Sequence, residues 1–524
     1  MSLSDILLGF SVALSAYNLF YCLVGVTLGT FIGVLPGLGP LVTISVLLPI
    51  TFSLPPETAL IMLAGIYYGA AYGGSTTAIL VNIPGESSSV VTCIDGYAMA
   101  KQGRAGPALA MTTIASFAAG CIATLVVALF APPLATWALG FQSPEYFALM
   151  VLGLLTATAL AHGSLLKSLG MVILGLLLGL VGTDVTSGTF RFTYQFMELT
   201  DGLSFVVVAM GMFGIAEVIM TLEQPVRRVL VSTKIRHMMP TAEDFRAAWK
   251  PILRGTGLGS FFGILPGAGT TISSFMSYAV EKRVARDPSR FGQGAIEGIA
   301  GPESANNAAA QTSFIPTLTL GIPGSATMAL MLGALTVYGI APGPRVMTSH
   351  PSLFWGLIAS MWIGNLMLLV LNLPLIGIWV RMLTVPYRLL YPAIVLLCCV
   401  GVYTLANSSF DVFVMALFGV LGYLLRKLDF SPAPLLLGFV LGPMMEENLR
   451  RSMLLSRGDP MIFFSRPLSL IMLLAAAGLL VAAMAPAVRA KAPDGVVSVL
   501  GALVRRPRRG TEDLTRETAT EEKQ

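Results

Sequence analysis

The chain contains one glycine- and proline-rich phrase twice, each time inside an apolar stretch. Residues 29–40 read GTFIGVLPGLGP and residues 259–270 read GSFFGILPGAGT, an offset of 230 positions. A second shared phrase, IPG, follows at 83–85 and at 322–324, an offset of 239 positions. Apolar segments that are interrupted at corresponding places in two halves are typical of transporters built from repeats, whose substrate sites lie at the interruptions.

The scarcity of charge places these phrases in a membrane protein. Only 11% of the 524 residues are charged and 55% are hydrophobic, whereas soluble domains carry about 25% charged residues. Asp, Glu, Lys and Arg are absent from 6–56, 105–144, 255–280, 304–344 and 346–380. Several of these stretches exceed the ~20 residues that a helix needs to cross a bilayer. The sequence therefore predicts an all-α polytopic membrane protein with Gly/Pro-broken or re-entrant helices.

The two phrases divide the chain into repeated halves around a basic segment. Arginine and lysine gather in that segment, which we expect to face the cytoplasm. We favour an inverted arrangement of the halves, although the number of spans in each half, which decides between parallel and inverted repeats, stays open. The expected parts are a first transmembrane repeat at 1–222, a basic cytoplasmic connector at 223–254, a second transmembrane repeat at 255–490 and a disordered tail at 491–524.

Both proline-glycine phrases are predicted to break a helix at membrane depth. Proline removes a backbone donor and glycine permits left-handed backbone, so a helix is expected to stop there and a new one to begin. The free N–H groups and positive dipole end of the new helix suit an anion. A kink or a close helix crossing is the alternative for either copy alone. The break residues that we expect to bind substrate are Pro36, Gly37, Gly39, Pro266, Gly267 and Gly269.

Polar residues are dense around the breaks and around the IPG phrases. Hydroxyls and amides can donate to a carboxylate, and their oxygens can bind a small cation. The alternative for each hydroxyl is a hydrogen bond to the backbone of its own helix. The further candidates for substrate binding are Ser75, Thr76, Thr77, Asn82, Thr270, Thr271, Asn306, Asn307, Pro323 and Gly324.

Two acidic residues, Glu86 and Glu303, lie nearest the motifs. A carboxyl at membrane depth is a candidate cation ligand or proton carrier, and the alternative is a helix-capping role at the membrane interface. We expect Na⁺ or H⁺ as coupling ion, with Na⁺ near the Gly/Pro breaks as the candidate metal, and no other cofactor. No ATP-binding G-x-x-x-x-G-K-[ST] motif occurs, and the three histidines are scattered without metal or catalytic spacing. We therefore expect no catalytic residues and no enzyme activity.

At these motifs the chain resembles the large membrane subunit of bacterial tripartite tricarboxylate transporters. The similarity spans about residues 17–486. It is carried by GVLPGLGP at 33–40, YGGSTTAILVNIPGE at 72–86, GILPGAGT at 263–270, GPESANNAA at 301–309, TLGIPGSATMALMLGAL at 319–335 and LLLGFVLGPMMEENLRRS at 435–452. The resemblance implies a small membrane subunit and a periplasmic solute-binding protein as partners, an inner-membrane location and organic acids as substrates. It assigns no role to an individual residue.

These observations favour a secondary active importer of di- or tricarboxylates that is coupled to a cation gradient. Because the basic residues lie in connectors between apolar spans, a nucleic-acid partner is not expected. A passive anion channel and an integral membrane enzyme are the alternatives. An enzyme would need a convergent acid, base or nucleophile, and the sequence contains no triad or metal spacing of that kind.

Overall fold

The computed structural model describes residues 3–35, 38–159, 164–184, 186–223, 238–265, 267, 269–383 and 387–491. The chain divides into two compact units, Met1–Ala476 and Ala477–Gln524, and every site discussed below lies in the first. Helices dominate the described residues, and one small antiparallel hairpin pairs Gly182 with Arg191 and Thr183 with Phe190. The predicted all-α membrane fold is confirmed.

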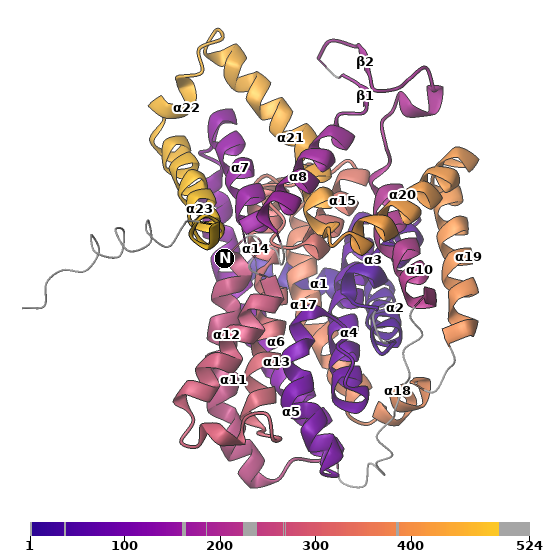
Figure 1. Ribbon diagram of the computed structural model, residues 1–524, viewed down its shortest axis with the longest axis vertical. Helices are drawn as coiled ribbons and strands as arrows, with labels where there is room; N and C mark the ends of the chain where they lie inside the picture. Colours follow the sequence, from indigo (N-terminus) through magenta and orange to yellow (C-terminus); the bar gives the residue numbers. More distant parts are fainter. Residues whose placement is uncertain are drawn as a thin grey trace, which may run out of the picture. The chain divides into compact units, whose positions relative to one another are not determined.

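The helices of the N-terminal part run in the order shown in Figure 1. They are α1 (Leu3–Ala13), α2 (Ala16–Gly33), α3 (Pro40–Thr51), α4 (Pro56–Val81), η1 (Ser87–Ser89), α5 (Val90–Lys101), α6 (Ala105–Ala138), α7 (Ser143–Ala159), α8 (Leu165–Gly179), η2 (Met197–Leu199), α9 (Phe205–Ala209), the π-helical turn η3 (Met210–Ile215) and α10 (Ala216–Glu223). Strands β1 (Gly182–Thr183) and β2 (Phe190–Arg191) lie between α8 and η2.

The C-terminal part begins after the basic connector. Its helices are α11 (Ala242–Ile264), α12 (Gly269–Val284), η4 (Pro288–Arg290), α13 (Glu297–Thr312), α14 (Phe314–Leu320), α15 (Ala326–Val337), α16 (Val346–Ser349), α17 (Pro351–Asn372), α18 (Ile376–Met382), α19 (Tyr387–Ala406), α20 (Ser409–Lys427), α21 (Ala433–Leu455), α22 (Ile462–Ser465) and α23 (Pro467–Lys491).

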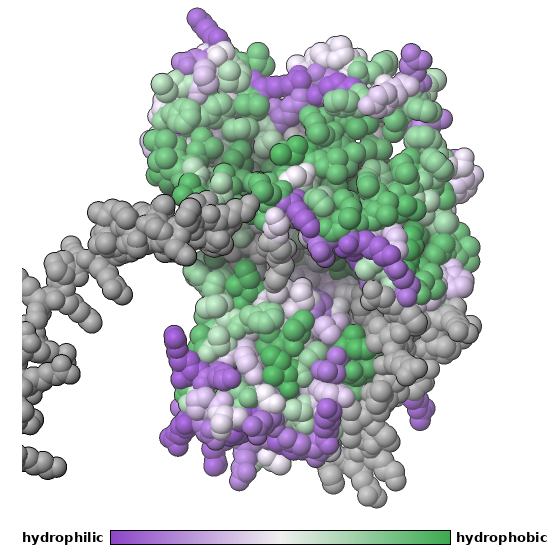
Figure 2. Space-filling model, in the orientation of Figure 1, coloured by the Kyte–Doolittle hydropathy of each residue, from purple (hydrophilic) through white to green (hydrophobic). Residues whose placement is uncertain are grey.

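Six helical segments of the described residues are long and apolar enough to cross a membrane. They are Ala16–Gly33, Ala105–Ala138, Phe205–Glu223, Pro351–Asn372, Ser409–Lys427 and Pro467–Met484. Figure 2 shows hydrophobic side chains over much of the visible face. Hydrophilic side chains gather at the end that carries the β1–β2 hairpin and at the end that carries the lower parts of α5 and α11.

Helices stop and restart at both proline-glycine phrases. Helix α2 ends at Gly33 and α3 begins at Pro40, while α11 ends at Ile264 and α12 begins at Gly269. Proline at the first position of α3 suits a helix start, because the missing N–H would have no partner there. The predicted residues Pro36, Gly37 and Pro266 lie outside the described residues.

Stripes of glycine bring two pairs of helices to backbone distance. In α2 the stripe is Gly25, Gly29 and Gly33, and it packs on α4. A Cβ atom at Gly29 would overlap the carbonyl oxygen of Ile66 in α4. Small residues at every fourth position are a common way for membrane helices to pack closely, because dispersion and weak contacts then act between the backbones themselves.

The second pair of helices repeats this contact. The stripe of α11 is Gly255, Gly259 and Gly263, each 230 positions after its counterpart in α2. A Cβ atom at Gly259 would overlap the carbonyl oxygen of Ala305 in α13, which follows Ile66 by 239 positions. These are the offsets of the two sequence phrases, so the packing supports the interpretation of the chain as two repeats.

The helix ends before the two IPG phrases also correspond. Asn82 ends α4 with φ 58°, and Gly321 ends α14 with φ 71°, so both adopt left-handed backbone. The two positions are again 239 apart. Glycine takes this conformation without strain, and asparagine is among the few other residues that tolerate it.

Two connectors contain helix that the sequence pattern did not indicate. Residues 86–106, a more polar stretch between two apolar segments, include η1 and α5. The side chain of Asp95 on α5 is fully buried, and one of its oxygens accepts the backbone N–H groups of Gly292, Gly294 and Ala295 at 2.8–2.9 Å. A contact across some 200 positions decides this local structure, and no local pattern records it.

Helix α11 begins inside the segment expected to be connector. A reciprocal capping box starts it, in which the Thr241 hydroxyl accepts from the backbone of Asp244 and the Asp244 carboxylate accepts from the backbone of Thr241. Such a box satisfies donors that a helix start leaves free. Residues 224–237 of the connector and 492–524 of the tail lie outside the described residues.

The glycine contacts provide a matched pair of substitutions on one helix. We expect Gly259→Ala to lower the thermal stability of the detergent-purified protein, because overpacking typically costs about 1–3 kcal/mol. Gly257→Ala adds the same methyl group where nothing lies within 4 Å, so it serves as the control. Thermal unfolding followed by size-exclusion chromatography measures both. Equal melting temperatures for the two variants would show that the contact is not tight.

Candidate substrate site

The break and the IPG phrase of each half meet in space. In the second half, the backbone N–H of Gly267 donates to the carbonyl oxygen of Gly324 at 2.9 Å. In the first half, a Cβ atom at Gly39 would lie 2.9 Å from the carbonyl oxygen of Gly85. In each half, the non-helical chain at the break therefore packs against the non-helical chain at the IPG phrase. This contact explains why each half contains both phrases.

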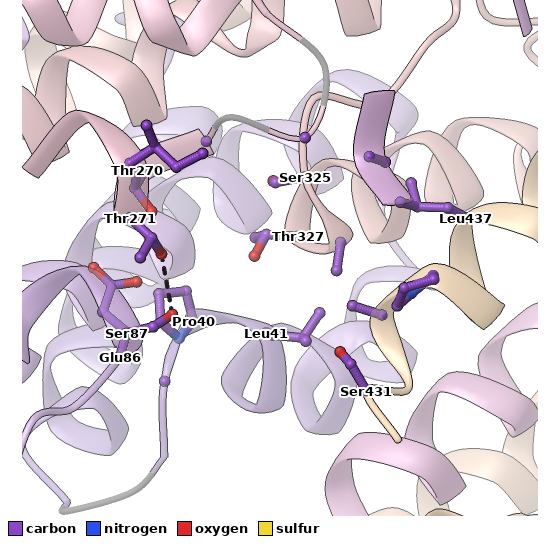
Figure 3. A pocket seen from close by; sticks show the side chains of 18 of the residues that line it. Pro40, Leu41, Glu86, Ser87, Thr270, Thr271, Ser325, Thr327, Ser431 and Leu437 are labelled. Atoms are coloured by element: carbon purple, nitrogen blue, oxygen red, sulfur yellow. Dashed lines mark hydrogen bonds between the residues drawn. The ribbon is translucent and has the colours of Figure 1, made fainter. Parts of the chain in front are cut away.

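Both pairs of phrases border one cavity of about 580 Å³, which Figure 3 shows from close by. This volume falls in the usual range of about 300–1,000 Å³ for small-molecule pockets. The lining residues are Gly39, Pro40, Leu41, Glu86, Ser87, Ala157, Glu217, Gly267, Gly269, Thr270, Thr271, Ile272, Ser325, Ala326, Thr327, Arg426, Ser431, Ala433, Pro434 and Leu437.

Four helices begin at this cavity. The first residues of α3, α12, α15 and α21 all line it. The opening turn of a helix leaves N–H groups without intrahelical partners and carries partial positive charge. Four such ends around one hollow create a positive environment made of backbone, to which the hydroxyls of Thr270, Thr271, Ser325 and Thr327 add further donors (Figure 3).

Equivalent positions of the two halves line the same cavity. Gly39 and Gly269 are 230 positions apart, and Glu86 and Ser325 are 239 positions apart. The halves also touch directly, since the Thr271 hydroxyl donates to the Ser87 hydroxyl at 3.1 Å (Figure 3). The cavity therefore lies where the proposed repeats meet.

The charged side chains of the lining are Glu86, Glu217 and Arg426. Arg426 forms an ion pair with Glu217, so these two charges largely offset each other. Glu86 accepts a hydrogen bond from the Asn306 side-chain amide at 2.9 Å. The side chains alone do not make the cavity positive, and any preference for an anion has to come from the helix N-termini and the hydroxyls.

A second carboxyl, that of Glu303, lies one helical turn from Asn306 and does not line the cavity. The side chain of Glu303 is only 1% exposed, and it accepts hydrogen bonds from the hydroxyls of Ser75, at 2.7 Å, and Thr92. Its hydrogen-bond partners come from α4 and α5, so the carboxyl joins the first half to the second. Among the described residues no arginine or lysine pairs with it.

The residues predicted from the sequence occupy three different places. The cavity lining includes Gly39, Glu86, Gly267, Gly269, Thr270 and Thr271. The predicted residues that are buried and do not line the cavity are Ser75, Thr77, Glu303, Asn306, Asn307, Pro323 and Gly324.

Two other predicted residues have local structural roles: one ends a helix, and the other contacts the backbone of its own helix. Asn82 has an exposed side chain and forms the left-handed end of α4, while the Thr76 hydroxyl contacts the carbonyl oxygen of Tyr72 in its own helix. Thr77, by contrast, donates to the carbonyl oxygen of Val34 at 2.9 Å, where α2 ends. Thr77 thereby satisfies a backbone group that the break frees.

Sequence reasoning missed the contribution of α21. The stretch Ser431-Pro432-Ala433-Pro434 begins that helix at the cavity, and proline near a helix start is a recognisable signal. The sequence shows Arg426 and Glu217 as charged residues, but their spacing along the chain does not predict that they form an ion pair at the cavity. No cluster of three His, Cys, Asp or Glu residues that could hold a metal ion occurs in the described part of the chain.

Comparison with known proteins shows the family of the chain. A family model described as "Tripartite tricarboxylate transporter TctA family" matches residues 19–437. The chain belongs to the TctA family of tripartite tricarboxylate transporters. The family match and the apolar helices make it a multi-pass membrane transport protein, and the TctA family is a family of transporter components rather than enzymes.

Two relatives of this TctA-family chain come from Agrobacterium vitis. One, described as "Uncharacterized 52.8 kDa protein in TAR-I ttuC' 3'region", is 57% identical over 93% of this chain and 97% of its own length. The other, described as "Uncharacterized protein in TAR-II ttuC' 3'region", is 57% identical over 44% of this chain and 96% of its own length. No solved structure matches the chain.

The glycines of the second break allow a graded test of the cavity. We expect Gly267→Ala to reduce carboxylate uptake at least tenfold, because its φ is +78° and a Cβ atom would overlap the backbone of Ala157. Gly269→Ala adds only the cost of left-handed backbone, about 1–2 kcal/mol, since nothing lies within 4 Å of its Cβ position.

Uptake into membrane vesicles measures the effect of both glycine variants. Size-exclusion chromatography in detergent controls for insertion and folding. Equal loss in the two variants would mean that the close approach of Gly267 to α7 does not shape the cavity.

Proposed function

We propose that this protein is the large membrane subunit of a secondary active importer that takes organic di- or tricarboxylates across the bacterial inner membrane. The proposal is supported above all by the convergence of four helix N-termini and several hydroxyls on one cavity at the junction of the two halves. Backbone N–H groups at helix starts bind carboxylates without needing a buried basic side chain.

The proposed site residues divide between substrate and ion. Gly39, Gly267, Gly269, Thr270 and Thr271 provide backbone and hydroxyl donors around the substrate. The buried residues Ser75, Asn306 and Asn307 position the wall of the cavity. Pro36, Gly37 and Pro266 belong to the same breaks by sequence.

The proposed coupling site is Glu303, with Glu86 as the link to the substrate. An isolated ionised carboxylate is costly to bury, so Glu303 favours either a bound proton or a bound cation. Asn306, one turn along α13, donates to Glu86 in the cavity lining. The side-chain oxygen of Asn306 is buried and has no hydrogen-bond partner among the described residues, which makes it a candidate ligand for Na⁺ beside Glu86.

Membership of the TctA family implies which partners to expect. A small membrane subunit and a periplasmic solute-binding protein would complete the tripartite system, with the binding protein delivering the carboxylate. Among the alternatives, a passive anion channel is less well supported because the cavity is walled by packed half-helices. An enzyme is less well supported because the cavity lining offers no nucleophile held by a general base.

Reconstitution tests the coupling directly. We expect proteoliposomes that contain the chain and its two partners to accumulate a carboxylate above the outside concentration only when a Na⁺ or proton gradient is imposed. The measurement is uptake of radiolabelled di- and tricarboxylates with and without each gradient. Equilibration that is independent of both gradients and does not saturate would establish a channel instead.

Substitution of the buried carboxyl tests its role in coupling. We expect Glu303→Gln to abolish gradient-driven accumulation while substrate exchange across the membrane persists, because a neutral amide cannot gain or release the coupling charge. Glu297→Gln is the matched control on the same helix, since Glu297 pairs with Arg290 in an exposed setting.

Paired assays of accumulation and counterflow distinguish these outcomes. Wild-type accumulation in Glu303→Gln would remove this residue from the coupling mechanism. The ion whose gradient no longer drives uptake in the variant identifies the coupling ion.

A further inference from the structure

We propose that the protein holds a second, outer binding site for the carboxylate groups of its substrate, at Arg345. This inference rests on the proposed transport of carboxylates and concerns a different cavity from the one at the helix breaks. The second cavity has a volume of about 340 Å³. Its lining residues are Leu139, Phe141, Gln142, Ser143, Tyr146, Met150, Leu320, Ala341, Pro342, Gly343, Pro344, Arg345, Met444, Asn448 and Arg451.

The charge of this cavity differs from that of the cavity at the breaks. Two arginines, Arg345 and Arg451, line it, and its lining contains no aspartate or glutamate. The cavity at the breaks combines one arginine with two glutamates. A guanidinium binds a carboxylate through two parallel hydrogen bonds, so the second cavity carries the side chains best suited to a carboxylate.

Arg345 is uncommitted to any other group of the described chain. Its guanidinium forms no ion pair or hydrogen bond with a described residue, and the Tyr146 side chain lines the same cavity. Arg451 forms an ion pair with Glu447 one turn earlier in α21, where both side chains are exposed. Exposed pairs of this kind contribute little stability, so an arriving anion can compete for Arg451.

The neighbouring arginine shows by contrast what a structural role looks like. Arg450 contacts Asp184 at 3.1 Å and Glu446 at 2.7 Å, which fastens the β1–β2 hairpin to α21. A hydrogen bond from Ser187, together with the Thr186 backbone and Arg450, lowers the pKa of Asp184 to about 2. Asp184 is therefore ionised at any physiological pH and keeps Arg450 occupied, whereas Arg345 and Arg451 face the cavity.

The two cavities share the same walls. On α7, Met150 lines the second cavity and Ala157 lines the cavity at the breaks. On α21, Met444 and Leu437 do the same. Each pair is seven residues apart, which is two turns or about 10 Å along a helix. The second cavity therefore lies two turns away from the first along both helices.

The IPG phrase of the second half connects the two cavities. Leu320 lines the second cavity, and Ser325 lines the cavity at the breaks. Between them, the left-handed Gly321 packs on the chain at Pro342, with its Cβ position 3.0 Å from that carbonyl oxygen. A carboxylate held by Arg345 would thus be separated from the substrate site by one short stretch of non-helical chain.

We place the second cavity on the outer side of the membrane. The segment Phe205–Glu223 is long and apolar enough to cross a membrane, and it separates the β1–β2 hairpin from the basic connector that we expect to face the cytoplasm. The second cavity lies on the hairpin side. It is lined by Asn448 and Arg451 of α21, close to the residues of that helix that hold the β1–β2 hairpin. A positive cavity at that side would raise the local concentration of anionic substrate and accelerate capture. The inferred role is a staging site, in which one carboxylate of the substrate pairs with Arg345 before the molecule moves to the helix breaks.

Transport kinetics with citrate and malate as probes test this role. In proteoliposomes with the complete transporter, we expect Arg345→Gln to raise KM about tenfold with kcat unchanged, and Arg345→Lys to recover part of the loss. Arg286→Gln, an exposed arginine near η4 on a different segment, is the control and should match the wild type. The KM of the wild type should also rise steeply with salt, and that of Arg345→Gln should not.

Binding to the full chain in nanodiscs separates this proposal from the proposed function. We expect two citrate-binding sites in the wild type and loss of one in Arg345→Gln, while Gly267→Ala loses the other. An unchanged KM, a loss of kcat alone or a single site in the wild type would overturn the staging site. Failure of the wild type to transport any carboxylate would overturn the proposed function, whereas the binding count would still report on Arg345.

An anionic lipid headgroup is the alternative ligand for the arginines of the second cavity. Repeating the kinetics in pure phosphatidylcholine vesicles and in vesicles that contain phosphatidylglycerol decides between them. We expect the KM effect of Arg345→Gln in both compositions. An effect seen only with phosphatidylglycerol would assign the cavity to a lipid and overturn the proposal.

Discussion

The close packing of α2 on α4 and of α11 on α13 is the contact on which the rest of the structure depends. Glycine removes the side chain between each pair, so the backbones themselves set the distance. The stripes run up to Gly33 and Gly263, and the helices end within a residue or two of those positions. The breaks are therefore placed by rigid helix pairs, and the loops between α2 and α3 and between α11 and α12 start from fixed points.

Membrane depth makes such breaks demanding, because a freed N–H or C=O group has no water to bind. Other parts of the protein provide the missing hydrogen-bond partners. The Thr77 hydroxyl donates to the Val34 carbonyl oxygen, and the Gly267 N–H donates to the Gly324 carbonyl oxygen. The opening turns of α3, α12, α15 and α21 line the cavity, and the N–H groups of a helix's opening turn have no partner within their own helix. In the proposed function, a substrate that accepts hydrogen bonds would pair with these N–H groups, which favours an anion over an apolar solute.

The sequence predicts the repeated breaks because proline and glycine at matching offsets leave a local mark that needs no knowledge of the fold. It also predicts Thr270, Thr271 and Glu86 near the cavity, since they follow the phrases directly. It does not predict α5, whose buried Asp95 depends on backbone donors some 200 positions away. Nor does it predict the Arg345 cavity, since α7, the 341–345 turn and α21 share no motif and meet only in the folded chain.

Charge balance links substrate binding to ion binding in the proposed mechanism. The cavity at the breaks holds an arginine already paired with Glu217, and the carboxyls of Glu86 and Glu303 lie along one route from the lining into the interior. Bringing an organic anion beside two ionised carboxylates would be unfavourable, so a proton or cation on that route makes substrate binding easier. Substrate must by the same linkage strengthen binding of the ion, since coupling free energies are reciprocal. A carrier built this way needs no separate device to couple the two fluxes, because the bound proton or cation removes negative charge that would otherwise repel the substrate.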